Sequence, residues 1–447
     1  MDFSAMIGNF DQFLWGWPLI ILFLAVSVIV MLALRFVQIR YFIDAWHMVF
    51  HPSKSEVQTE AKSEISPFQA FIAALGTATG NGSIAGIATG IYVGGPGTAF
   101  WMLVAGLVGM GLRFAEVYIA TCFTGVHTFR GALGGPMVYL NRVPGKSFLP
   151  YVFAGMFLVY GLIGGNAMQA NSMADAINYT WGINRWIIAA CFLAFLLYAS
   201  LGGAKRILHI SDRLTPFKVA IFLICGIIVL IGNYHAILPS IVLIIKSAFT
   251  CQAAMGGVVG WTIQVAMKEG LVRSLTMSEA GLGSAALAFG ATGSKKPVQD
   301  SLLSMVPVFI STFVVGLLVA LCVVSSGVWN NGEQAIHLTI AAFGTVFSCY
   351  AGWIVTFISA SFGLGCMAAV LFIAMRSWLF LTNNRFVWGY YILFCAAAFL
   401  GAIAKVGVIW SLVDIIVGLM LLINLYAIIW LLPTVLRGLR SHEEHKG

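Results

Sequence analysis

The chain has 447 residues, of which 60% are hydrophobic and 9% are charged, and its mean hydropathy is +0.95. Because about a quarter of the residues in a soluble domain are charged, this composition excludes a soluble protein and predicts a polytopic membrane protein in the lipid bilayer. The net charge of +8 does not indicate a nucleic-acid partner, since the basic residues are distributed as a membrane topology requires.

The hydrophobic stretches predict an all-α protein with about eleven transmembrane helices, if about 20 apolar residues make one span. In chain order these spans are 14–34, 66–93, 98–121, 151–178, 185–201, 214–232, 252–275, 301–325, 338–375, 387–404 and 408–432. Residues 1–65 form an extra N-terminal helix with a cytoplasmic linker, residues 66–432 a ten-helix core, and residues 433–447 a cytoplasmic tail.

The basic residues predict the topology. With the N-terminus outside, the cytoplasmic segments are 35–65, 122–150, 202–213, 268–300, 376–386 and 433–447. Of the 24 Lys and Arg residues, Arg185, Lys246 and Lys405 then fall in external segments, which is a strong positive-inside bias. We expect a multi-pass protein of the plasma (inner) membrane with a cytoplasmic C-terminus. The segment 236–250 is apolar enough for a twelfth span, but the bases favour a lateral or re-entrant external segment.

The second span is too rich in glycine for an ordinary helix. Its stretch from Ala74 to Gly97 reads ALGTATGNGSIAGIATGIYVGGPG. Each glycine inside a helix costs about 1 kcal/mol relative to alanine, so the cluster requires a reason. One reason is close packing through Gly82, Gly86 and Gly90; the other is an unwound segment whose backbone groups bind a solute or an ion.

The third core helix carries three amides and a hydroxyl within its span, at Asn166, Gln169, Asn171 and Ser172. Such a set is expected to face the interior of the bundle. Asn166 and Gln169 are three residues apart and share a helical face, so we predict that both point at one cavity. The alternative is that these amides make hydrogen bonds between helices.

A second glycine-broken span contains AAMGGVVGWT at residues 253–262. Counted from residue 66, the two broken helices are the first and the sixth of ten. That arrangement is typical of two inverted five-helix repeats, each of which contributes one discontinuous helix to a central site. We therefore predict repeats at 66–232 and 236–432, with close packing of both clusters as the alternative.

Acidic residues within the spans require partners, because an ionised carboxylate at the bilayer centre costs at least about 2.5 kcal/mol. Glu116 follows Arg113 by three residues, and we predict a structural ion pair between them. Glu279 lies in an expected intracellular turn, where we predict that it fastens a gate to a base. Asp414 is expected to be paired or near an interface, with a proton or cation role as the alternative.

Motifs of enzymes are missing from the sequence. It contains no P-loop, no HExxH and no histidines at metal-ligand spacing, and its eight cysteines form no CxxC pair. GNGSIA at 80–85 fits GxGxxA formally, but no βαβ unit surrounds it, so a dinucleotide site is excluded. We predict a protein that is not an enzyme and has no cofactor and no resident metal.

Six segments, in order, resemble the alanine or glycine:cation symporter family. They are GNGSIAGIATGIYVGGPGTAFWM (80–102), RFAE (113–116), GNAMQANSMADAI (165–177), GGAKRI with LTPF (202–217), SEAGLGSA (278–285) and VDIIVGLMLLINL (413–425). The resemblance covers most of the chain from Pro67 onward. It implies the leucine-transporter-type fold, here a 5+5 inverted repeat with one extra N-terminal helix. It also implies sodium-coupled uptake of small neutral amino acids such as alanine and glycine.

The resemblance assigns the site by position. The family's GTGN corresponds to Gly80, Asn81, Gly82 and Ser83, so this chain has Asn for Thr and Ser for Asn. The expected substrate-binding residues are Thr79, Gly80, Asn81, Gly82, Ser83, Asn166, Gln169, Gly257, Val258, Gly260 and Trp261. The expected cation-binding residues are Gly76, Thr79, Ser361, Gly365 and Cys366.

The eighth core helix departs from the family pattern. Family members have a Ser-Thr pair whose hydroxyls join carbonyls of the first core helix around sodium. This chain has Gly365 and Cys366 there, and hard cations prefer oxygen ligands. Sodium is the expected coupling ion, with a proton as the alternative.

The expected mechanism follows from the broken helices. Their free N–H groups attract the substrate carboxylate, while unwound carbonyls face its ammonium group or a cation. Val258 and Trp261, with Gly80 and Gly82, leave a small apolar pocket. We expect a monomeric carrier that works by alternating access; an uncoupled carrier and a channel are the alternative functions.

Overall fold

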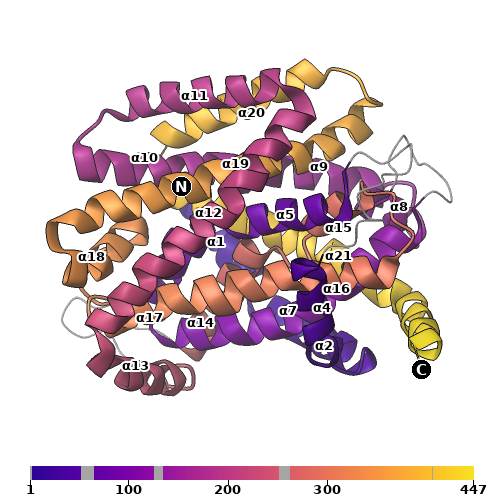
Figure 1. Ribbon diagram of the computed structural model, residues 1–447, viewed down its shortest axis with the longest axis horizontal. Coiled ribbons are helices and arrows are strands. Elements are labelled where there is room, and N and C mark those ends of the chain that lie inside the picture. Colours follow the sequence, from indigo (N-terminus) through magenta and orange to yellow (C-terminus); the bar gives the residue numbers. More distant parts are fainter. Residues whose placement is uncertain (1–2, 52–64, 125–133, 251–261, 405, 447) are drawn as a thin grey trace.

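The computed structural model describes residues 3–51, 65–124, 134–250, 262–404 and 406–446, and within these ranges the chain forms helices and no strand (Figure 1). The α-helices are α1 (Phe3–Leu14), α2 (Trp17–Ala33), α3 (Val37–Arg40), α4 (Phe42–Phe50), α5 (Pro67–Ala78), α6 (Ala85–Gly94), α7 (Gly97–Cys122), α8 (Pro136–Leu140), α9 (Leu149–Leu162), α10 (Met168–Trp181), α11 (Arg185–Leu201), α12 (Gly203–Gly232), α13 (Tyr234–Ser247), α14 (Ile263–Ser278), α15 (Ser284–Gly290), α16 (Pro297–Phe309), α17 (Leu317–Ser325), α18 (Ala335–Phe347), α19 (Ala351–Thr382), α20 (Val387–Ile403) and α21 (Val406–Lys446). Asn81–Ser83 and Ser348–Tyr350 are 3₁₀ turns, and Ile163–Ala167 and Ile310–Gly316 are π-helical.

The membrane character of the fold is confirmed by the length and composition of its helices. Among the described residues, six helical stretches are long and apolar enough to cross a membrane, and two bent helix pairs raise this number to eight. Three further apolar helices, α11, α13 and α20, have 17, 14 and 17 residues. The protein is therefore an all-α polytopic membrane protein, whereas eleven spans in a 5+5 repeat stay a prediction.

The long helices form a layered bundle. Figure 1 shows α11 and α20 side by side along one edge, α19 through the middle, and α7, α14 and α16 along the opposite edge. In the same view α8, the turn from α19 to α20 and the C-terminal end of α21 lie toward the right-hand end, and α13 and α18 toward the left-hand end. The three segments at the right-hand end are all predicted to be cytoplasmic.

The apolar segment 236–250 forms most of helix α13, which follows α12 after Asn233. Its 14 residues are fewer than the roughly 20 that a span needs. Leu238 is 71% exposed on this helix, and the helix packs against α7 and α17. These properties favour the predicted lateral segment over a twelfth span.

The glycine-rich stretch after Ser66 is a broken helix. Ser66 and Gln69 form a capping box at the start of α5, with Pro67 in the first turn. The α5 helix ends at Ala78, and the axis bends by 52° before the chain continues through the 3₁₀ turn into α6. This confirms the predicted break, at the position of the Gly80-Asn81-Gly82 sequence.

The third core helix is also irregular, because a π-helical segment at Ile163–Ala167 separates α9 from α10. Glycines before and within this segment allow α19 to approach closely. A Cβ atom added to Gly161 would lie 2.5 Å from Cβ of Ala374, and one added to Gly165 would lie 2.5 Å from Val370. Segments of this kind occur frequently at functional sites.

Candidate functional site

The hydroxyls at the break of the first core helix bond to carbonyls of its own last turn. Thr79 Oγ1 donates to the carbonyl of Leu75 over 2.6 Å, and Ser83 Oγ donates to the carbonyl of Ala78 over 3.3 Å. Both side chains are fully buried. Since the last carbonyls of a helix lack partners within it, these two predicted site residues stabilise the broken end of α5.

Asn81 joins three core helices at the break. Its backbone N–H donates to Oε1 of Gln169 over 2.7 Å. Its side-chain amide donates to the carbonyl of Ser359 over 3.2 Å, and the Ser359 hydroxyl donates to Oδ1 of Asn81 over 2.8 Å. The structure thus brings the predicted residues Asn81 and Gln169 together and adds Ser359 of α19.

The two glycines that flank Asn81 have different surroundings. A Cβ atom on Gly80 would lie 2.9 Å from Oε1 of Gln169 and 3.0 Å from Sγ of Cys366. A Cβ atom on Gly82 would meet nothing nearer than the Met168 methyl carbon at 3.8 Å. Gly80 is therefore required by close contact, while Gly82 borders room for about one methyl group.

The other amides of the third core helix bind α20. Asn166 Nδ2 donates to the carbonyl of Phe394 over 2.6 Å. Asn171 Nδ2 donates to the carbonyls of Gly401 and Ala404. These are the hydrogen bonds between helices that the sequence left as an alternative. Asn166 lies in the π-helical segment, whose wider turn rotates it away from the direction that an α-helix would share with Gln169.

The predicted contribution of the second broken helix lies outside the described residues. This applies to Gly256, Gly257, Val258, Gly260 and Trp261. The helix is described from its cap at Thr262, whose hydroxyl accepts from the N–H of Val265 at the start of α14. Thr276 of α14 lies near Gly82, with its Cγ2 3.9 Å from an added Cβ atom.

Two of the expected cation ligands, Gly76 and Gly365, lie against a lysine. Nζ of Lys218, on α12, donates to the carbonyl of Gly76 over 3.0 Å. A Cβ atom on Gly365 would lie 3.0 Å from the same Nζ, and the Phe362 ring centroid lies 5.5 Å from it. Lys218 is fully buried.

The remaining expected ligands do not form an oxygen cage. Cys366 Sγ faces the carbonyl of Thr77 at 3.6 Å. The Ser361 hydroxyl donates to Ile358 in its own helix, and the Thr79 hydroxyl donates to Leu75. With an ammonium group at the Gly76 carbonyl and sulfur in place of a hydroxyl, these residues do not fit the oxygen coordination that a hard cation prefers.

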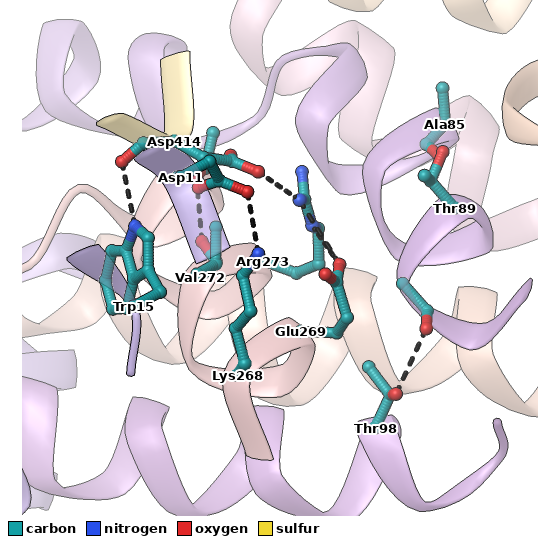
Figure 2. A network of polar contacts seen from close by, with 12 residues as sticks. Asp11, Trp15, Ala85, Thr89, Thr98, Lys268, Glu269, Val272, Arg273 and Asp414 are labelled. Carbon is teal, nitrogen blue, oxygen red and sulfur yellow. Dashed lines mark hydrogen bonds and ion pairs between the residues drawn. The ribbon is translucent and has the colours of Figure 1, made fainter. Parts of the chain in front are cut away.

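A buried ionic network lies beside the broken helix (Figure 2). Arg273 of α14 pairs with Asp414 of α21 at 2.6 Å and with Glu269 at 3.2 Å. Gly90 of α6 packs on this arginine, since an added Cβ atom would lie 2.8 Å from its Cγ. Asp414 is thus paired, as expected from its place in a span.

A neighbouring ion pair joins α14 to α1. Lys268 pairs with Asp11 of α1 at 2.6 Å (Figure 2), and α1 precedes the first span. Trp15, which follows α1, donates its Nε1–H to the backbone carbonyl of Asp414. This part of α21 therefore lies beside the end of α1. Lys268 therefore lies within α14, and the predicted turn follows the end of this helix at Ser278.

Arg113 and Glu116 hold the turn that follows α14. Arg113 Nη2 donates to the carbonyl of Ser278, and Glu116 Oε2 accepts from the N–H of Gly281 over 2.9 Å. In the part of the chain that the structure describes, no ion pair joins the two side chains, so the predicted pair is wrong. The reason is that the turn offers each charge a backbone partner.

Among the described residues, Glu279 is bonded to a phenol, and no ion pair joins it to a base. Tyr160 Oη donates to Oε1 of Glu279 over 2.9 Å, and both residues are buried. Asn424 of α21 donates to the carbonyl of Gly281 over 2.8 Å. The turn is thus held from α7, α9 and α21.

Comparison with known proteins identifies the family of the chain. The whole chain, residues 1–447, matches the sodium:alanine symporter family. The chain belongs to this family. A sodium/alanine symporter, AgcS, of Methanococcus maripaludis is 30% identical over 454 residues, which cover 99% of this chain and 98% of that protein.

Two other relatives are similar to the chain over nine tenths or more of their length. An uncharacterized transporter of Haemophilus influenzae is 32% identical over 446 residues, covering 99% of this chain and 96% of that protein. A probable sodium/glutamine symporter, GlnT, of Bacillus subtilis is 27% identical, covering 99% and 91%. As a member of this family of transporters, the chain is a transporter and not an enzyme.

The sequence left two residues of this family member unassigned. Lys218 lies alone within an apolar span, and a charge at that depth is a functional signal. Ser359 is one of two serines in an apolar stretch of α19. Which of the two, Ser359 or Ser361, faces the break depends on the register of the helix, which the sequence alone does not fix.

Proposed function

We propose that this chain takes up small neutral amino acids, such as alanine and glycine, as a secondary active transporter driven by a cation gradient. The observation that carries the proposal is the buried break at Gly80–Gly82, where a backbone N–H bonds to Gln169 of the third core helix. Broken helices at membrane depth supply free backbone dipoles for a zwitterion without a buried charge.

The Asn81–Gln169 bond supports a specific role for the break. The Oε1 atom of Gln169 accepts from the Asn81 N–H, as the carboxylate oxygen of an amino acid would. We propose that the substrate carboxylate replaces this oxygen, and that the unwound carbonyls face the substrate ammonium group. Gly256, Gly257, Val258, Gly260 and Trp261, together with Ser83 and Thr79, complete the proposed surroundings.

The space at Gly82 supports a small substrate. Atoms of Met168 and Thr276 lie 3.8 and 3.9 Å from the position of an added Cβ atom, which is an ordinary contact distance. A hydrogen or methyl side chain fits such a space better than a long one. This favours alanine and glycine, whereas the name of GlnT gives glutamine as the second substrate to test.

The proposed transport cycle requires two matched broken helices. We propose that residues 66–232 and 236–432 are inverted repeats that rock around the break, within the plasma membrane, with the N-terminus outside and the C-terminus inside. The protein is proposed to work as a monomer without a cofactor. The names of two relatives favour Na⁺ as the coupling ion, and H⁺ is the alternative.

Counterflow of labelled alanine tests the proposal. Purified protein is placed in liposomes loaded with unlabelled alanine and diluted into labelled alanine without any ion gradient. A carrier accumulates label transiently, whereas a channel only equilibrates it. Absence of a transient with alanine, glycine, serine and glutamine would overturn the proposed function.

A further inference from the structure

Lys218 occupies the place where the family resemblance expects a coupling cation. It lies in the apolar stretch His209–Gly232, which is long enough to span a membrane. Its side chain is fully buried, and its Nζ bonds to the carbonyl of Gly76, an expected cation ligand, over 3.0 Å. No carboxylate among the described residues forms an ion pair with it.

The residues opposite Lys218 are matched to an ammonium group. A Cβ atom on Gly365 would lie 3.0 Å from Nζ and 3.3 Å from Cδ of Lys218, so a serine there would require the lysine to shift by a few tenths of an ångström. The Phe362 ring lies 5.5 Å from Nζ, within the range in which an aromatic face attracts a cation. The absence of a side chain at Gly365 of α19 thus leaves the room that the end of the Lys218 side chain from α12 occupies.

The hydroxyls near Gly76 do not provide a separate sodium cage. Ser211 and Thr215 lie on the same face of α12 as Lys218, and their oxygens lie 3.1 Å from the position of an added Cβ on Gly76. Both lack a hydrogen-bond partner. A sodium ion beside them would lie close to the Lys218 ammonium group, and two positive charges that water does not screen repel strongly.

We infer that the Lys218 ammonium group is the resident cation of this site, and that the site takes no sodium ion. For transport, the inference rests on the proposed function, because a coupling site has a role only in a carrier. The consequence is that uptake by this chain is independent of sodium and that the alternative coupling ion, H⁺, replaces the Na⁺ that the names of two relatives favour.

Two measurements on the full-length protein test the inference. The first compares labelled alanine uptake into proteoliposomes with external NaCl or choline chloride at equal ionic strength. The second compares thermal unfolding of the detergent-solubilised protein in the same two salts. A ligand that binds only the folded state raises the melting temperature, so this second readout does not depend on transport.

The Lys218→Met variant is expected to differ from the wild type and from a control variant in how its melting temperature responds to sodium. The wild type has the same uptake and the same melting temperature in both salts. Lys218→Met removes the ammonium group and leaves the Gly76 carbonyl with the unpartnered hydroxyls of Ser211 and Thr215 as oxygen ligands, so NaCl raises its melting temperature by a few degrees relative to choline chloride. Lys246→Ala, which removes an exposed lysine on α13, is the matched control and behaves as the wild type.

Failure of the inference and failure of the proposed function give different results. A sodium-specific rise in the wild-type melting temperature, or uptake that collapses in choline, overturns the role of Lys218. Absence of counterflow for every amino acid tested overturns the proposed function. In that case, the wild-type melting curves still decide whether sodium binds.

Discussion

The backbone N–H of Asn81 and the side-chain oxygen of Gln169 lie 2.7 Å apart and join two core helices that are separated by 88 positions in the sequence. Gln169 is held from its other end, because its Nε2 donates to the carbonyl of Gly164. The π-helical segment that contains Gly164 therefore sets the position of the oxygen at the break.

Replacing Gln169 with leucine is expected to reduce alanine uptake strongly. The change removes the acceptor of the Asn81 N–H, and an unsatisfied buried donor costs about 1–3 kcal/mol. Uptake and the melting temperature are measured together. Asn178→Leu removes an exposed amide that bonds only to nearby Ile183, and it serves as the control. Full uptake by Gln169→Leu would contradict the role given to this oxygen.

The glycines at 80 and 82 are expected to respond differently to alanine. In Gly80→Ala the new methyl group lies within 3.0 Å of the Gln169 amide and the Cys366 sulfur, so it displaces the oxygen from Asn81. We expect lower stability and loss of uptake. Gly82→Ala folds as the wild type does, since its methyl group meets ordinary contact distances, and Gly82→Leu folds without transport.

Substrate competition then tests the space at Gly82. Because the added methyl group of Gly82→Ala fills room for a substrate side chain, the KM for alanine is expected to rise more than the KM for glycine. Equal changes for both substrates would show that Gly82 does not border the side-chain pocket. Membrane expression and melting temperature control for misfolding of each variant.

Sequence reasoning located the break because glycine has a local cost that does not depend on tertiary structure. Gly80 and Gly82 interrupt an apolar span wherever that span lies. By contrast, the π-helical segment at Ile163–Ala167 depends on packing of Gly165 against Val370 of α19, more than 200 positions away. The spacing of Asn166 and Gln169 in the sequence therefore could not predict that Asn166 points in another direction.

The partners of the charged residues, which are also distant in the sequence, could not be predicted either. The sequence indicates that Asp414 and Lys218 need partners, because each lies in an apolar stretch. It does not indicate which partner, since Arg273 lies 141 positions from Asp414 and Gly76 lies 142 positions from Lys218. The predicted pair of Arg113 and Glu116 was wrong for this reason: sequence proximity favoured it, whereas the Ser278–Gly281 turn supplied better partners.

Neutralising Asp414 is expected to destabilise the protein more than neutralising Glu269. Asp414→Asn leaves Arg273 with its more distant partner, and removal of one member of a buried ion pair costs about 3–5 kcal/mol. Glu269→Gln leaves the 2.6 Å pair intact. Thermal unfolding measures both changes. The triple variant Glu269→Leu, Arg273→Met, Asp414→Leu should be more stable than Arg273→Met alone, because no charge of the network is left unpaired; greater loss in the triple variant would contradict this.

Tyr160→Phe is expected to loosen the turn after α14. The substitution removes the hydroxyl that donates to Glu279 and leaves a buried carboxylate without that partner, at a cost of about 1–3 kcal/mol. Because the turn is also held by Arg113, Glu116 and Asn424, we expect local opening and not global unfolding. Hydrogen exchange of residues 278–283 measures this opening. Tyr426→Phe, which removes a hydroxyl bonded to the carbonyl of Pro144 at the surface, is the control and leaves exchange at 278–283 unchanged. Unchanged exchange in Tyr160→Phe as well would mean that Tyr160 does not hold the turn.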